Sequence, residues 1–232
     1  MAETTPPPAP MLRVNRRHLA DATIAVAALG FAVLTSLFRT TALSDAERDI
    51  FEAVNHMSNV FSVPVEGVMM LGTLIAVPGA AILAMLFRRF RLATVLLAAG
   101  CVAYALARVA KPIVDAGRPL AVLPNTDVIV RGAIALGLGY PSGHSAVSAA
   151  LAVVALPYLP GRYRWLILLV PAIVGFGRIY VGAHLPLDVI GGWAIGVASA
   201  FAVHLIAGRP PFTRIVDPAR VEAEADPVPA SA

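Results

Sequence analysis

The chain has 232 residues, of which 58% are hydrophobic and 14% are charged, and its mean hydropathy is +0.78. Soluble domains average about 45–50% apolar and about 25% charged residues, so the composition excludes an ordinary soluble domain and indicates an integral membrane protein. The net charge of +4 is carried by basic residues that lie between apolar runs. This distribution is typical of an orientation signal in a membrane and argues against a nucleic-acid partner.

Six apolar segments occupy residues 19–207, and no repeat or linker divides them into two domains. The run from Gly67 to Phe87 is uncharged over 21 residues, which at about 1.5 Å per residue is enough for the roughly 30 Å hydrocarbon layer. The sequence therefore predicts an all-α integral membrane protein, a bundle of six transmembrane helices. The expected spans are Leu19–Phe38, Phe61–Phe87, Leu92–Ala110, His144–Tyr158, Trp165–Tyr180 and Leu185–Ala207.

Two further parts of the chain lie outside these spans. Residues 1–18, which are basic and Pro-rich, and residues 208–232, which are rich in Pro, Ala and acidic residues, are expected to be disordered tails. The first connection, "SDAERDIFEAVNHM", begins with Ser44 and has Glu47 three residues later, the pattern of a capping box. Its apolar residues recur at helical spacing. We expect an amphipathic interfacial helix between the first and second spans, used for packing or as a rim that guides a lipid tail.

The basic residues predict the orientation of the bundle. If the connections alternate between the two sides, one side receives 11 of the 18 cations, and the positive-inside rule makes that side cytoplasmic. Both termini are then cytoplasmic. The 11 cations are Arg13, Arg16, Arg17, Arg88, Arg89, Arg91, Arg162, Arg164, Arg209, Arg214 and Arg220. The other seven are Arg39, Arg48, Arg108, Lys111, Arg118, Arg131 and Arg178.

Three stretches with unusual polar residues fall together on the extracytoplasmic side. They are "KPIVDAGRP" (residues 111–119), "YPSGHS" (residues 140–145) and "GRIYVGAHLPLD" (residues 177–188). Ionisable groups are costly in an apolar medium unless they are paired, so such residues in a membrane protein favour a functional site. We expect the three stretches to converge at one membrane boundary.

The residue types in these stretches suit phosphate chemistry. Lys111, Arg118 and Arg178 offer the charge and the donors that bind phosphate oxygens. Ser142 and Gly143 open a helix, whose free backbone N–H groups and dipole also favour an anion. As an alternative, the three cations could be interfacial anchors that extend to the headgroups. Four arginines outside the motifs are expected to be such anchors or lipid contacts: Arg39, Arg48, Arg108 and Arg131.

The histidines and the aspartate suit covalent catalysis. Asp188 follows His184 by four residues, one helical turn in a helix that starts near His184, so its carboxylate can hold one imidazole nitrogen. The other nitrogen is then free to act as a nucleophile. His144, on a different helix, can serve as the general acid.

The three motifs together resemble those of the type 2 phosphatidic acid phosphatase superfamily, which also includes the vanadium haloperoxidases. The matching patterns are K-x6-RP (Lys111, Arg118, Pro119), PSGH (Pro141 to His144) and R-x5-H-x3-D (Arg178, His184, Asp188). The chain departs from the family at Gly177, where a serine is common. The resemblance implies that His184 attacks phosphorus, Asp188 orients it, His144 protonates the leaving oxygen, and no metal or other cofactor is needed. It also implies a phosphate cradle of Lys111, Arg118, Ser142, Gly143 and Arg178.

The predicted function is that of a cell-membrane phosphatase acting on a lipid phosphate or diphosphate. Prenyl diphosphates, phosphatidylglycerol phosphate and phosphatidic acid all fit, the sequence does not choose among them, and the oligomeric state is open. Two alternatives remain. One is a phosphotransferase that passes the phosphate to another lipid. The other is a transporter or scaffold that retains the fold without catalysis.

Overall fold

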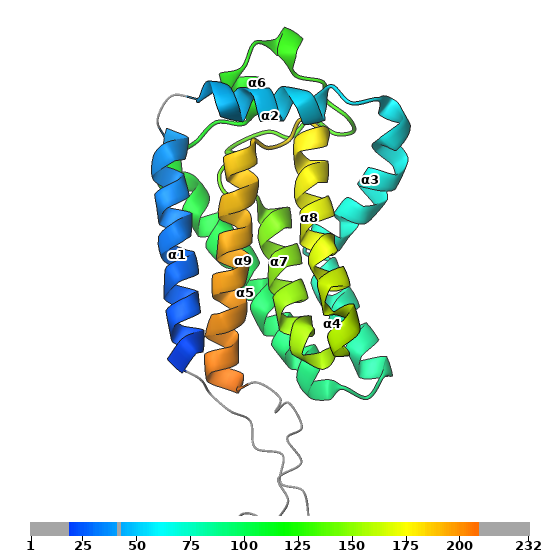
Figure 1. Ribbon diagram of the computed structural model, residues 1–232. Helices are drawn as coiled ribbons and strands as arrows, with labels where there is room; N and C mark the ends of the chain where they lie inside the picture. The colour runs from blue at the N-terminus through cyan, green and yellow to red at the C-terminus, as the bar shows by residue number, and fades with distance from the viewer. Residues whose placement is uncertain (1–18, 41–42, 209–232) are drawn as a thin grey trace, which may run out of the picture.

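In the computed structural model, residues 19–40 and 43–208 are described, and the predicted tails lie outside them apart from Gly208. The regular elements of this part of the chain are helices, and it contains no strand and one isolated β-bridge. The chain runs back and forth along a bundle (Figure 1). The bundle is formed by α1 (Leu19–Thr40), α3 (Ser62–Met69), α4 (Ala76–Leu86), α5 (Phe90–Val114), α7 (Gly143–Ala155), α8 (Arg164–Tyr180) and α9 (Pro186–Ala207).

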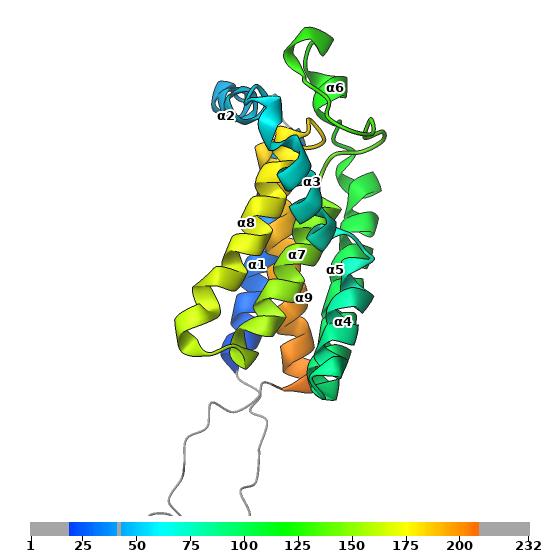
Figure 2. The ribbon, with the colours of Figure 1, turned by 90° about the vertical axis from the view of Figure 1, so that its right-hand side faces the viewer.

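Shorter elements connect these helices. Helices α2 (Asp45–Asn55) and α6 (Pro119–Val122) both lie at one end of the bundle, called here the α2 end (Figure 2). The helix α1 starts and α9 finishes at the opposite end, where α4 also turns into α5. The 3-10 turns are η1 (Asn59–Phe61), η2 (Met70–Gly72), η3 (Asn125–Asp127), η4 (Leu156–Tyr158) and η5 (Gly161–Tyr163).

Helix length and composition support a membrane protein. Within the described residues, four stretches are long and apolar enough to cross a bilayer alone: Leu19–Arg39, Phe90–Val114, Gly161–Tyr180 and Pro186–Ala207. Asn59–Gly72 and Ala76–Leu86 would together form a fifth, and Gly143–Tyr158 is a shorter apolar helix. Large apolar side chains on α1, α4 and α5 are exposed, as they would be against lipid. The protein is therefore a membrane protein, and its six-span count stays a prediction.

The second predicted span is broken rather than continuous. Its two helical parts are bent by 75° at residues 73–75, between η2 and α4. Pro78 lies in the first turn of α4 and has no backbone N–H to donate to the preceding turn. A straight helix through residues 73–78 would lose that hydrogen bond and would also meet a clash with the proline ring. The proline therefore explains why the helix restarts at Ala76.

The centre of the bundle is built on small residues where α7 packs against α9. A Cβ atom at Gly192 would lie 2.5 Å from the carbonyl oxygen of Ser142, and one at Gly196 would lie 2.3 Å from that of Ala146. Glycine at these positions lets the two backbones approach closely, as in other membrane helix pairs. The Ser142 N–H also donates to the Asp188 carbonyl (2.8 Å). The start of α7 and the start of α9 are thereby held together at the α2 end.

The helix α2 lies across the α2 end of the bundle (Figure 1). Ser44 is its N-cap, as predicted, and its hydroxyl oxygen accepts a hydrogen bond from the Glu47 N–H (3.2 Å). Glu47 does not complete a capping box: its carboxylate instead accepts from the Leu187 N–H (3.0 Å). Phe51 and Asn55, which belong to this helix, have fully buried side chains. The helix is thus docked on the bundle, and its location at a membrane surface stays a prediction.

Candidate active site

The three polar stretches converge, as predicted, at the α2 end. They enclose a cavity of about 200 Å³ between α5, α7, α8 and the loop that follows α8. Lys111, Arg118, Gly143, His144, Arg178 and His184 line it, together with Tyr104, Ala107 and Arg108 of α5. Six of the eight predicted site residues line this cavity, and a seventh, Asp188, contacts the lining residue His184. The side chain of the eighth, Ser142, bonds to Ser145 instead.

Lys111 holds the loop that precedes α7. It lies in the last turn of α5, and its ammonium group donates to the carbonyls of Leu138 (2.8 Å) and Gly139 (2.9 Å). The same loop is attached to the stretch after α5 by a β-bridge between Gly117 and Leu138. The ammonium group can donate three hydrogen bonds, so one remains for a ligand in the cavity. Lys111 therefore both shapes the site and adds positive charge to it.

The N-terminus of α7 opens into the cavity. Ser142 is the N-cap, and its hydroxyl group accepts from the Ser145 N–H (3.4 Å) and bonds the Ser145 hydroxyl group (3.0 Å). This side chain is fully buried and acts as the helix cap. Gly143, the first residue of the helix, has no other atom within 4 Å of the place where a Cβ would lie. An anion can therefore approach the free backbone N–H groups of this turn.

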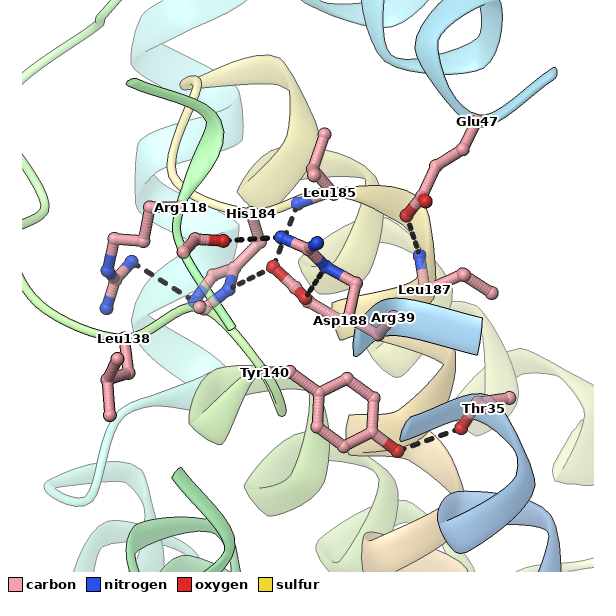
Figure 3. A network of polar contacts seen from close by, with 12 residues as sticks. Thr35, Arg39, Glu47, Arg118, Leu138, Tyr140, His184, Leu185, Leu187 and Asp188 are labelled. Carbon is pink, nitrogen blue, oxygen red and sulfur yellow. Dashed lines mark hydrogen bonds and ion pairs between the residues drawn. The ribbon is translucent and has the colours of Figure 1, made fainter. Parts of the chain in front are cut away.

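His184 and Asp188 form the predicted pair (Figure 3). The helix α9 begins at Pro186, two residues later than a helix starting near His184, so the histidine lies in the preceding loop. Its Nδ1 is 3.3 Å from Asp188 Oδ2, which also accepts from the Leu185 N–H (3.1 Å). Both side chains are almost completely buried. The short loop and the proline at the first helical position fix the histidine beside the carboxylate.

The contacts of His184 define its tautomer. Asp188 can only accept when it is ionised, so Nδ1 carries the proton. On the other side, Arg118 Nη1 lies 3.4 Å from His184 Nε2 (Figure 3). A guanidinium group can only donate, so Nε2 presents its lone pair toward the cavity. Burial lowers the pKa of His184 to about 3, and the charges of Arg178 and Arg118 act in the same direction, against Asp188. The imidazole is therefore neutral and nucleophilic near pH 7.

The cavity has the electrostatics of an anion site. Among its lining residues, all of which are described, four are cationic and none is acidic. The Nε atoms of Arg118 and Arg178 are buried and have no hydrogen-bond partner in the described part of the chain. Buried donors without partners are costly and uncommon, so these two N–H groups fit an acceptor that enters the cavity. Within the same residues, no cluster of three or more His, Cys, Asp or Glu side chains could hold a metal ion.

Three of the four arginines predicted to be membrane anchors have other roles. Arg39 is buried and forms an ion pair with Asp188 (2.8 Å). Arg131 is also buried, where its guanidinium group donates to the carbonyls of Asn55 (2.7 Å) and Tyr180 (2.6 Å). Arg108 lines the cavity. The anchor prediction was wrong for Arg39 and Arg131, because both donate hydrogen bonds to buried oxygen atoms. For Arg108 it missed the location of the residue at the cavity.

The sequence contained a signal for only one of these arginines. Arg108 follows Tyr104 by four residues and precedes Lys111 by three, so helical spacing places all three on one face of α5. Arg39 and Arg131 reach partners that are far away in the sequence, and local spacing could not identify them. For Arg48, the role of a membrane anchor or lipid contact stays a prediction.

The departure from the family motif at Gly177 has a packing reason. A Cβ atom at this position would lie 2.7 Å from Met69 Cγ and 2.9 Å from Val65 Cγ1, both on α3. Position 177 therefore faces α3 and not the cavity. Glycine allows α3 to pack against α8 just before Arg178, and a serine would not fit unless the side chains of Met69 and Val65, or α3 itself, moved.

The chain is also similar to known proteins. The family model described as the PAP2 superfamily matches residues 88–210. An undecaprenyl-diphosphatase from Sulfolobus acidocaldarius is 38% identical over 77 residues, which cover 33% of this chain and 37% of that protein. The chain thus matches only about a third of the length of this relative.

Two solved structures share the fold. The crystal structure of Aquifex aeolicus LpxE has a TM-score of 0.62 and 23% identity, covering 70% of this chain and 98% of that one. A transmembrane PAP2-type phosphatidylglycerolphosphate phosphatase from Bacillus subtilis has a TM-score of 0.58 and 19% identity, covering 77% and 93%. The family match extends from the turn before α5 past the end of α9 and contains all three motifs. This chain belongs to the PAP2 superfamily.

Proposed function

We propose that this protein is a lipid phosphatase that hydrolyses a phosphate monoester or diphosphate through a phosphohistidine intermediate. The observation that carries the proposal is the placement of His184. Its Nδ1 is held by a buried carboxylate, and its Nε2 lone pair faces a cavity with four cations. A nucleophile, an orienting group and donors for phosphate oxygens are the parts that phosphoryl transfer to an enzyme group requires.

The proposed first step is an in-line attack by His184 Nε2 on phosphorus. The N–P bond forms while the bond from phosphorus to the leaving oxygen breaks, and His144 donates a proton to that oxygen. Lys111, Arg118, Arg178 and the start of α7 bind the other phosphate oxygens, whose charge they neutralise. His184 keeps its proton on Nδ1, so the intermediate is a cationic imidazole that Asp188 stabilises.

The proposed second step regenerates the enzyme. A water molecule gives a proton to His144 and attacks phosphorus, the N–P bond breaks, and inorganic phosphate leaves. Because the four cations supply the charge that a metal ion would supply elsewhere, the proposal needs no metal. EDTA should leave the rate unchanged. Orthovanadate, an anion that can become five-coordinate on a histidine, should inhibit. Loss of activity in EDTA that Mg²⁺ restores would contradict the mechanism.

A lipid carrier of the phosphate is favoured by the location of the site. The cavity lies at the end of a bundle whose outer surfaces are apolar, so a substrate headgroup would meet the site with its tail along the helices. The likeness to an undecaprenyl-diphosphatase supports a prenyl diphosphate as the first substrate to try.

The purified full-length protein in detergent can be tested against undecaprenyl diphosphate, phosphatidylglycerol phosphate and phosphatidic acid, with free phosphate as the readout. Release of phosphate by the wild type but not by His184→Ala is expected. Arg162→Met, an exposed arginine at the opposite end, is the matched control. A substrate labelled with ³²P should leave an acid-labile label on the wild type. Transfer that requires an acceptor lipid would instead indicate a phosphotransferase. No turnover of any kind would indicate a transporter or scaffold.

We further propose that the α2 end is extracytoplasmic and both termini are cytoplasmic. The described basic residues of the cytoplasmic set lie at the opposite end, in the turns before α5 and α8 or in the first residues of these helices: Arg88, Arg89, Arg91, Arg162 and Arg164. After the single cysteine, Cys101, is replaced by serine, a cysteine at Asn125 should react with an impermeant thiol reagent in intact cells. A cysteine at Arg89 should not. The reverse pattern would place the site in the cytoplasm.

A further inference from the structure

The last turn of α1 brings an arginine to the catalytic pair. Arg39 has an almost fully buried side chain, and its Nε donates to Asp188 Oδ1 at 2.8 Å (Figure 3). Its Nη2 donates to the carbonyl of Gly117, in the loop of the first motif. Arg39 belongs to none of the three motifs, and it lies before the residues matched by the family model. It is nevertheless the direct partner of a catalytic carboxylate.

The two oxygens of Asp188 have separate partners. Oδ1 faces Arg39, whereas Oδ2 accepts from His184 Nδ1 and the Leu185 N–H. A buried carboxylate requires a compensating charge, because its desolvation is expensive. If the imidazole were the only charged partner available, the favoured arrangement would be a protonated imidazole beside the carboxylate. A permanently charged guanidinium group on the other oxygen removes that requirement.

Other charged groups also face the pair, and none replaces Arg39. Lys111, Arg118 and Arg178 act on Asp188 or His184 across the cavity, where a phosphate would compete for them. Glu47 of α2 carries a negative charge near Arg39 and Asp188, and Tyr140 lies close to Asp188. Tyr140 itself bonds Thr35 of α1 (2.8 Å). Arg39 is the cation that contacts Asp188 from the side away from the cavity.

We infer that Arg39 is a positioning residue that keeps His184 neutral and protonated on Nδ1. It does so by neutralising Asp188 through the ion pair with Oδ1, on the side away from the cavity. It does not touch the substrate and acts through the carboxylate. The role as nucleophile rests on the function proposed above, whereas the protonation state of His184 does not. With Arg39 present, Asp188 serves as a hydrogen-bond acceptor for a neutral imidazole. Without it, the pair should bind a proton at higher pH, and Nε2 should lose its free lone pair for part of the time.

The direct test is the titration of His184 followed by NMR with ¹⁵N-labelled histidine in the full-length protein in nanodiscs. His184→Ala identifies the signals. In the wild type we expect the Nδ1-protonated neutral tautomer throughout pH 5–8. In Arg39→Met, which has a similar length and no charge, the midpoint should rise by roughly 1–3 pH units, the usual effect of a nearby opposite charge. Arg39→Lys should restore most of the wild-type titration. Arg48→Met, on α2 at the same end, is the matched control.

The second readout is the pH dependence of kcat/KM. The acid limb should move to higher pH in Arg39→Met and return toward the wild type in Arg39→Lys. A structural role alone would lower the melting temperature or the rate equally at all pH values, without moving the limb. An unchanged tautomer and midpoint of His184 in Arg39→Met would overturn the inference, even if activity falls. If the wild type turns over no substrate, the proposed function fails, while the NMR titration still decides the role of Arg39.

Discussion

The two ends of the bundle contain cavities of opposite character, one lined by charged residues and the other by apolar ones. At the α2 end, ionisable groups are buried around a cavity of about 200 Å³, and several of them, such as His184, Asp188 and Lys111, have specific partners. Toward the opposite end, an apolar cavity of about 670 Å³ lies between α4, α5, α7 and α8, lined mainly by aliphatic side chains such as Leu83, Leu96 and Leu151. Buried charges require exact partners, whereas apolar walls tolerate change. The α2 end should therefore be sensitive to small substitutions that the other cavity accepts.

The largest effect is expected for His184→Ala, which should abolish turnover of every substrate because no covalent intermediate can form. Asp188→Asn should retain the nucleophile but lose its orientation and the stabilising charge, at a cost of up to about 10⁴-fold in kcat. Initial rates with a lipid diphosphate check both. Residual turnover in His184→Ala that is absent from His144→Ala would mean that the two histidines have each other's roles.

His144→Ala separates proton donation from phosphate binding. General acid catalysis contributes typically 10²–10⁴-fold, and roughly that loss is expected for a phosphate ester of a simple lipid alcohol, a poor leaving group. A lipid diphosphate or an aryl phosphate leaves as a weaker base, so the variant should keep a larger share of wild-type activity on these. Equal losses on good and poor leaving groups would show that His144 binds phosphate instead.

The same glycine-to-alanine change can be made at both ends. At Gly139 the new methyl group would lie 2.9 Å from Asp188 Oδ2 and 2.8 Å from the Gly117 carbonyl. The carboxylate must then move, and a displacement of about 1 Å can cost around 10²-fold in rate. Gly79 of α4 lines the apolar cavity and has no atom within 4 Å of a Cβ. Gly79→Ala should keep full activity and stabilise α4 by about 0.5–1 kcal/mol. Similar losses of activity in both variants would break the contrast.

A smaller effect is expected between the two ends, at Gly177. Gly177→Ser would restore the residue common in the family but would press against Met69 and Val65 of α3. Overpacking of this kind typically costs about 1–3 kcal/mol of stability. Thermal unfolding in detergent should show the loss, and Gly67→Ala, where a Cβ meets no atom within 4 Å, provides the control. A serine variant as stable as the wild type would mean that α3 packs less rigidly than its contacts indicate.

The last expected effect is the pH dependence of stability. Burial lowers the pKa of His184 to about 3 in the folded protein, against about 6.5 when it is exposed. Between these values the unfolded chain binds more protons, so stability is complete above pH 6.5 and is lost as the pH falls toward 3, by at most about 1.4 kcal/mol per pH unit. Melting temperatures from pH 7.5 to 4.5 should therefore decline less in His184→Gln than in the wild type. Parallel declines would mean that His184 is solvated in the folded protein.

Much of the geometry of the candidate site was predictable from the sequence because its key contacts are local. Ser142 caps α7, Pro186 starts α9, and Asp188 meets His184 four residues earlier, all within a turn or two of the chain. The three motifs also lie at the same end, since apolar segments of fixed direction alternate with polar connections. Such contacts depend on spacing, which a sequence displays directly.

Only the tertiary structure decided the contacts between distant segments. Arg39 and Asp188 are 149 residues apart, and nothing in the spacing around either one indicates that α1 packs against the start of α9. The hydrogen bonds of Arg131 to Asn55 and Tyr180 and the packing of Gly177 against α3 have the same origin. Considered from the sequence around it, each of these residues is compatible with more than one role; an arginine, for example, could equally be a membrane anchor. Which of these it becomes depends on the neighbour that the folded bundle brings within a few ångströms, because short-range packing and hydrogen bonding act only at contact.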